Sequence, residues 1–236
     1  MLEESIQNLY RVFSAYKLNR KIYGCYCNVC LSENYNQYLH QKKLTELNDE
    51  DFIAYLSSCE ILSDDQNDFK HFVPRMLELY ARPVNPETYL YDKNFQTYFY
   101  DIFCYRLGES LYTKWKVDEV DAVNNFFKEL WYHRVKTKNA DIIIDLLYDL
   151  ADAQYPVEFC LKHLSSLKPE VLTELLVQLY DSNHLKELNK YDFNPVNEYR
   201  VKIKDWFLTS KNIDLLNDYF KSGKDSYGRT SLIINF

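Results

Sequence analysis

Three cysteines, Cys25, Cys27 and Cys30, stand within six consecutive positions directly after Gly24. Thiols this close together could chelate a soft cation, exchange disulfides, or pack as small apolar side chains. Only the first two of these are functions. Gly24 would let the backbone curl so that the sulfur atoms converge.

A tetrahedral zinc site would need a fourth ligand besides these three cysteines. His71 is the first candidate, because it is polar and lies in a segment expected to pack on the N-terminal helices, and Cys59 is the alternative. The cluster lacks the paired Cys-x-x-Cys knuckles of the common zinc modules. Zinc binding, a reactive thiol and ordinary packing therefore all stay open, and zinc is the one cofactor that the sequence raises.

A second group of polar residues lies at helical spacing between Asp68 and Arg75. Asp68, His71 and Arg75 would share one helix face and could bind a phosphate or a carboxylate, or do acid–base work. A structural role is equally open. In that case Asp68 caps or pairs, His71 bonds a carbonyl group, and Arg75 satisfies carbonyls freed by a helix break expected at Pro74.

Asp145, Asp149 and Asp152 follow one another at i, i+4 and i+7 on another expected helix. This spacing predicts a solvated acidic face, which a basic protein partner could also use. The sequence has no nucleophile elbow, no paired metal-binding histidines and no Gly-rich phosphate loop, so catalysis is not expected.

The elements that would position these residues are predicted to be helices. Aromatic residues make up 17% of the 236 positions, which predicts an aromatic core, while glycine and proline are scarce. We expect an all-α fold of about nine to eleven amphipathic helices in a single array that could be solenoid-like. Apolar residues recur at helical spacing over residues 2–16, 52–59, 120–131, 142–150, 157–164, 169–180, 196–208 and 213–220.

Local signals mark where several of these helices begin. Asn48 with Asp51 reads as a cap pair, Pro169 as a first helical residue, and Ser210 as a cap. We expect one helical domain over residues 1–236. An irregular aromatic segment near 82–100 and a weak point near 136–139 are its two candidate subdivisions, and residues 222–236 look like a loosely held tail.

The formal net charge is −7, which argues against nucleic acid as a partner and is compatible with a basic protein partner. The N-terminal residues carry acids and no apolar run, so no signal peptide is expected. The longest aliphatic stretch, Ile142–Ile144, is flanked by Asp141 and Asp145, so no membrane span is expected either. Thiols without a secretory signal indicate the cytoplasm.

The chain resembles a group of uncharacterised bacterial standalone proteins that share two motifs. The first is Gly-Cys-Pro-Cys-Cys, which corresponds to Gly24–Asn28, and the second is Asp-Phe-Lys/Arg-His-Phe-Leu-Pro-Arg, which corresponds to Asp68–Arg75. Later segments of the group are similar to Trp115, Glu119, Ala122, Val123, Phe126, Leu130 and Trp131, and to Val201, Trp206, Phe207, Leu216 and Phe220. The resemblance implies an order of segments and no activity.

This chain departs from the group at the first motif. Tyr26 replaces the proline and Asn28 replaces the third cysteine, while Cys30 offers a thiol two positions later. The preferred hypothesis is a helical protein-interaction module, either an adaptor or an immunity-type neutraliser of a basic protein such as a toxin. The alternative is a small zinc-binding or thiol-based protein that uses Cys25, Cys27, Cys30 and His71.

Overall fold

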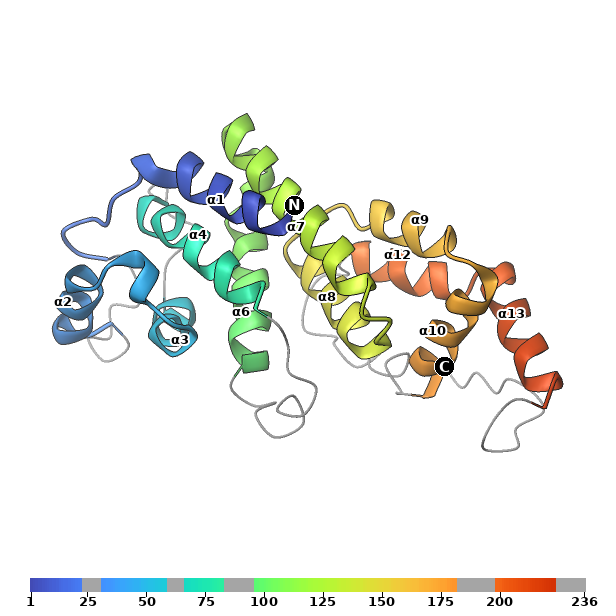
Figure 1. The fold of residues 1–236 in the computed structure, drawn as a ribbon. Coiled ribbons are helices and arrows are strands. Elements are labelled where there is room, and N and C mark those ends of the chain that lie inside the picture. The colour runs from blue at the N-terminus through green and yellow to red at the C-terminus, as the bar shows by residue number, and fades with distance from the viewer. Residues whose placement is uncertain (23–30, 59–65, 83–95, 182–197, 224–236) are drawn as a thin grey trace. The chain divides into compact units, whose positions relative to one another are not determined.

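The computed structural model describes residues 1–22, 31–58, 66–82, 96–181 and 198–223. Over these ranges the regular elements are all helices and no strand is present, which confirms the all-α class (Figure 1). The α-helices are α1 (Leu2–Val12), α2 (Glu33–Gln41), α3 (Asp49–Ser58), α4 (Asn67–Tyr80), α6 (Gln96–Glu109), α7 (Val117–Val135), α8 (Ala140–Asp152), α9 (Glu158–Ser165), α10 (Pro169–Asp181), α12 (Glu198–Phe207) and α13 (Ser210–Lys221). Three short 3-10 helices are η1 (Phe13–Ala15), η2 (Leu44–Glu46) and η3 (Tyr112–Lys114).

Several sequence predictions fall on residues outside the described ranges. These are the cysteines at 25, 27, 30 and 59, most of the aromatic segment, and the tail from residue 224. The described end of the aromatic segment, residues 96–100, is the first part of α6.

The chain divides into two compact units. The N-terminal unit contains residues 1–130 and 152–154, and the C-terminal unit contains residues 131–151 and 155–236. The division at residue 130 lies inside α7, a continuous helix, and neither of the two subdivision points expected from the sequence coincides with it. The single-domain interpretation stays a prediction.

Helix α4 is central in the N-terminal unit, where it contacts α1, α3, η1 and η2 (Figure 1). Its apolar side chains are buried, and so are Asp68 and Arg75 on the face expected to be polar. The prediction of a helix break at Pro74 is wrong, because α4 continues through this residue without interruption. Burial on several sides compensates for the hydrogen bond that proline cannot make.

The capping signals were partly right. The Asn48 side chain accepts a hydrogen bond from the Asp51 backbone N–H (2.9 Å), and Asp51 accepts one from the Asn48 N–H (2.9 Å), which confirms the cap pair. Pro169 is the first residue of α10. Helix α13 instead includes Ser210, and Thr209 holds the N-cap position without a side-chain cap bond.

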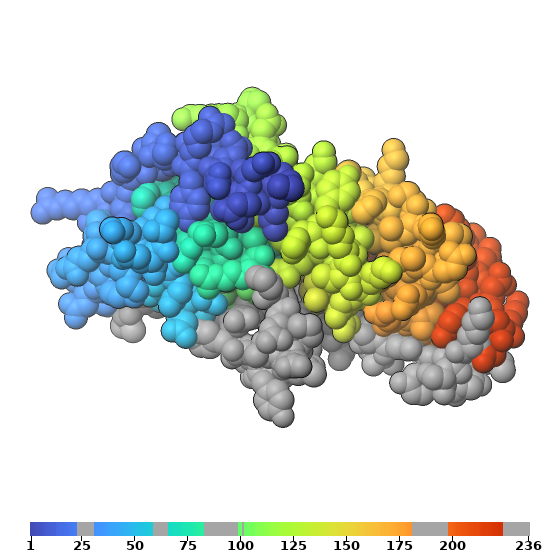
Figure 2. All heavy atoms as spheres, viewed as in Figure 1, coloured from blue at the N-terminus to red at the C-terminus, as the bar shows by residue number. Residues whose placement is uncertain are grey.

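The core is aromatic, as the composition predicts. In the N-terminal unit Phe72 packs edge-on against Phe52 and Tyr55, with ring centroids 5.3 and 4.9 Å apart. Side chains close the gaps between the ribbons of α1 to α4 on the face that Figure 2 shows. In the C-terminal unit α13 packs on α10 and α12, and the fully buried Trp131 lies against His163.

Candidate functional site

The chain between η1 and residue 22 has no regular secondary structure, and we call residues 16–22 the strap. The strap leads directly into the segment that carries the cysteine cluster. Because an irregular segment cannot satisfy its own backbone, its N–H and C=O groups need partners elsewhere. Side chains of α2 and α4 supply several of them.

Two of the predicted site residues on α4 hold the strap. Asp68 is buried and accepts hydrogen bonds from the backbone N–H (2.7 Å) and the side-chain amide (3.4 Å) of Asn19. His71 donates from Nδ1 to the carbonyl oxygen of Tyr16 at 3.0 Å, since a carbonyl can only accept. Asp68 and His71 of α4 therefore both hydrogen-bond to the strap, and these bonds hold the strap in place.

Burial lowers the pKa of His71, and the charges of Lys17 and His40 act in the same direction. The bond to Tyr16 and the charge of Asp68 oppose this shift without reversing it. The ring is therefore held neutral near neutral pH. Among the described residues, its Nε2 atom has no hydrogen-bond partner.

Helix α2 holds the other end of the strap. The Asn36 side chain accepts from the Ile22 N–H (3.1 Å) and donates to the Arg20 carbonyl (3.5 Å). His40 places Nε2 at 2.9 Å from the Asn19 carbonyl and Nδ1 at 2.7 Å from that of Asn36. Both partners of His40 are acceptors, so the two bonds coexist only when both ring nitrogens carry protons.

Arg75, the third polar residue of α4, does not touch the strap. Its Nε donates to the Leu47 carbonyl at 2.7 Å, and its Nη1 pairs with the Glu78 carboxylate at 2.6 Å. Tyr10 of α1 donates to the same Glu78 oxygen at 2.6 Å. Arg75 thus joins α4 to the end of η2, while Glu78 joins α4 to α1.

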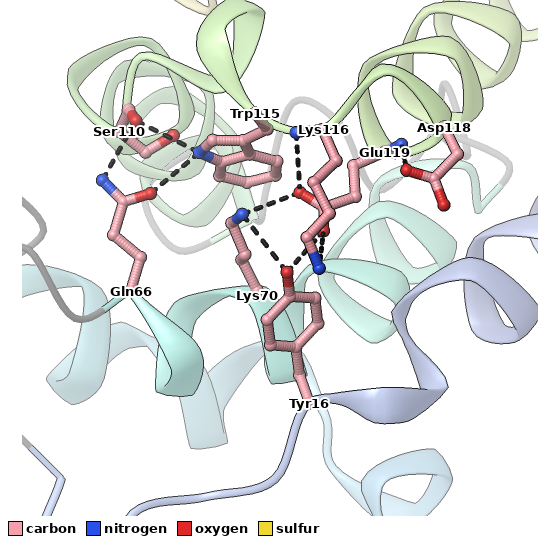
Figure 3. Close-up of polar contacts among 8 residues, drawn as sticks. All are labelled: Tyr16, Gln66, Lys70, Ser110, Trp115, Lys116, Asp118 and Glu119. Carbon is pink, nitrogen blue, oxygen red and sulfur yellow. Dashed lines mark hydrogen bonds and ion pairs between the residues drawn. The ribbon is translucent and has the colours of Figure 1, made fainter.

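A buried ion pair that the sequence reasoning did not single out lies at the start of the strap (Figure 3). Lys70 of α4 donates to Glu119 of α7 at 2.7 Å, with side chains only 13% and 2% exposed. Tyr16 donates its hydroxyl to the other oxygen of Glu119, and the Lys116 N–H lies 3.3 Å from the carboxylate. Both oxygens of this carboxylate therefore accept hydrogen bonds.

Aromatic rings enclose the ammonium group of Lys70. It lies 4.6 Å from the ring centroid of Trp115 and 5.2 Å from that of Tyr16, within cation–π range. The indole N–H of Trp115 donates to Gln66 at 2.8 Å, and Gln66 donates in turn to the Ser110 carbonyl at 3.1 Å (Figure 3). This cluster joins α4, the strap and the start of α7.

The chemistry of this cluster favours a fixed connection over proton transfer. Burial, with the hydrogen bond to Glu119 and the charge of that carboxylate, raises the pKa of Tyr16, so its hydroxyl stays protonated as a donor. Lys70 and Glu119 form an ion pair between buried side chains, where a charge without a partner would be costly. A signal for the pair existed in the sequence, because Lys70, Trp115 and Glu119 all lie in segments that carry the resemblance.

The three aspartates of α8 are partly buried, so the fully solvated face expected for them is not observed. Eight of the helix's residues are buried, including Ile142 to Ile144. Asp145 and Asp149 belong to the C-terminal unit and Asp152 to the N-terminal unit. Their role as a binding face stays a prediction.

The described residues contain no group of three His, Cys, Asp or Glu side chains placed to hold a metal ion, and the cysteines of the predicted zinc site lie outside them. Within the same ranges, no helix is both long enough and apolar enough to span a bilayer. The chain matches no family model, no curated protein and no solved structure.

Proposed function

We propose that the chain is a helical protein-binding module that recognises a basic protein through its N-terminal unit. The distribution of charge carries this proposal. The N-terminal unit has 21 acidic and 14 basic residues, whereas the C-terminal unit has 14 of each, so the net charge of −7 belongs to the N-terminal unit. Such a field steers an oppositely charged partner and raises its association rate.

Internal ion pairs use several of the cations of this unit. Lys42, Lys70, Arg75 and Arg106 each contact a carboxylate of their own unit, namely Asp51, Glu119, Glu78 and Glu109. By contrast, Glu3, Glu50, Asp118 and Asp121 are exposed and form no ion pair with a described Lys or Arg. Exposed carboxylates of this kind would attract the Lys and Arg side chains of a basic partner.

An adaptor and an immunity-type neutraliser of a basic toxin are the two roles that this charge pattern suits. A neutraliser needs only complementary charge and a few anchoring side chains. We place the role in the cytoplasm, in keeping with the buried cysteines Cys104 and Cys160, which form no disulfide bond.

The test is affinity purification of the full chain from its native cell, with quantification of stoichiometric proteins. The quadruple variant Glu3→Gln, Glu50→Gln, Asp118→Asn and Asp121→Asn should slow partner association, most strongly at low salt. The control is one triple variant that alters exposed acids of the C-terminal unit, namely Asp205→Asn, Asp214→Asn and Asp218→Asn. Equal effects of the two sets, or repeated absence of any protein partner, would refute the proposal.

A second candidate function, zinc binding with His71, is favoured by one observation. A histidine that binds a metal usually donates its other ring N–H to a carbonyl or carboxylate, which fixes the ring. His71 donates Nδ1–H to the Tyr16 carbonyl, is held neutral, and has Nε2 available among the described residues. Cys25, Cys27 and Cys30 would complete the ligand set that we expect from the sequence.

Elemental analysis of protein purified without a polyhistidine tag tests this candidate. About one zinc per chain is expected for four ligands, and Cys27→Ser should release it. Chelator should then lower the thermal stability of the wild type and leave that of the variant unchanged. Metal-free wild type whose stability does not respond to chelator would exclude the zinc site.

A further inference from the structure

A hollow of about 500 Å³ lies between the strap and α2. Among the described residues, its lining includes Asn19, Arg20, Lys21, Glu33 and Asn36. A volume of this size is within the range of small-molecule sites, which run from about 300 to 1,000 Å³. The lining residues that the structure describes all carry polar or charged side chains, which favours a polar ligand.

Two adjacent cations are the notable groups of this lining. Arg20 and Lys21 are both exposed, and neither forms an ion pair with a carboxylate of the described residues. The amides of the lining already take part in holding the strap, since Asn19 bonds Asp68 and Asn36 bonds the strap backbone. Among the described residues of the lining, the guanidinium and the ammonium group are the charged donors.

The backbone that carries these cations is held in place on both sides. Asn19, directly before Arg20, is fixed by Asp68 through its N–H and by His40 through its carbonyl. Ile22, directly after Lys21, is fixed by Asn36. A rigid base reduces the entropy lost when the two cations close on a ligand, which favours binding.

We propose that this hollow binds a small ligand through an oxyanion, either a carboxylate or a phosphate group. Arg20 would supply a planar fork of N–H donors and Lys21 a point charge, the usual combination for such groups. The acidic character of the unit does not prevent this, because charges farther than about 8 Å are largely screened at physiological ionic strength. Glu33, which lines the same hollow, opposes the anion and limits its affinity.

Binding of inorganic phosphate and of acetate to the full chain, measured by calorimetry or by amide shifts in NMR spectra, tests the proposal. The double variant Arg20→Gln with Lys21→Gln should weaken binding about tenfold or more, since two charged donors are lost. Glu33→Gln should tighten binding severalfold, a gain that no purely structural role of Glu33 would produce. Comparison of the two anions shows whether phosphate or carboxylate chemistry fits the hollow.

Lys17→Gln is the matched control, because Lys17 is an exposed cation of the same strap that does not line the hollow. Lys17→Gln should change the affinity for the anion by no more than about twofold, because it removes only a screened long-range attraction. The proposal is overturned if Lys17→Gln weakens binding as much as the double variant, or if wild type and double variant respond identically to both anions. Circular dichroism establishes that all variants keep the helical fold.

Discussion

Gly108 of α6 lies directly against the backbone carbonyl of Asp152 at the end of α8. A Cβ atom on residue 108 would lie 2.1 Å from that oxygen, far inside van der Waals contact. Only glycine therefore allows the two backbones to approach this closely. Both residues belong to the N-terminal unit, so this contact fixes residues 152–154 within it.

Gly108→Ala should destabilise the protein by about 1–3 kcal/mol, the usual cost of overpacking. The sign of this change in stability is informative, because replacing glycine by alanine inside a helix otherwise stabilises a protein by roughly 0.5–1 kcal/mol. Urea unfolding measures the change. A variant as stable as the wild type, or more so, would show that the two backbones are not in contact.

Lys70 and Glu119 should be strongly coupled, because removing one partner leaves the other buried without a matching charge. We expect Lys70→Met or Glu119→Gln alone to cost about 3–5 kcal/mol, and the double variant to cost clearly less than their sum. A double-mutant cycle in urea measures the coupling. The exposed pair of Lys202 and Glu158 (2.5 Å) is the control and should show far weaker coupling, so similar values for both pairs would contradict the role of burial.

His71 should make stability depend on pH, because burial lowers its pKa below the ordinary 6.5. Just below pH 6.5 the unfolded chain binds a proton that the folded chain does not, so the free energy of unfolding decreases as the pH falls. His71→Gln keeps a side-chain donor for Tyr16 but cannot titrate. The wild type should lose more stability than this variant between pH 7.5 and pH 5, and parallel profiles would exclude a buried neutral ring.

Trp131 and Trp206 should differ in how much each contributes to stability, because their burial differs. Trp131 is fully buried and donates to His163 at 2.9 Å, whereas Trp206 is half-buried and donates to Ser165 at 2.7 Å. Trp131→Ala should cost about 3–5 kcal/mol, and Trp206→Ala less. Chemical denaturation of both variants measures this, and a larger loss at Trp206 would contradict the observed burial.

Lys138 adopts a left-handed backbone conformation (φ 55°) two positions before the start of α8, and its side chain is exposed. Lys138→Gly should stabilise the protein by about 1 kcal/mol, since only glycine adopts this conformation without strain. Lys136→Gly, two positions earlier in the same exposed turn, is the control and should not stabilise. Thermal unfolding compares them, and equal effects would mean that backbone strain at residue 138 is absent.

Part of the fold could be predicted because its causes are local. Helical spacing of apolar residues predicted α1, α3, α7 to α10, α12 and α13 within a few residues, and the Asn48–Asp51 cap closes within one turn. Pro74 misled the prediction because proline disfavours a helix interior locally, while packing on several sides of α4 outweighs that preference. The sequence could not decide whether Asp68 and His71 bind a ligand or hold another segment of the chain. A polar helix face has the same residue spacing in both cases.

The sequence by itself determined the all-α class, the aromatic core and most helix positions, because these depend on residue type and on neighbours within a few positions. Only the tertiary structure decided what the polar residues contact. Asn19 meets Asp68 across 49 positions, Tyr16 meets His71 across 55, and Tyr16 meets Glu119 across 103. Such pairs form only when packed helices bring distant segments together, and a buried charge then requires a partner that sequence spacing does not reveal.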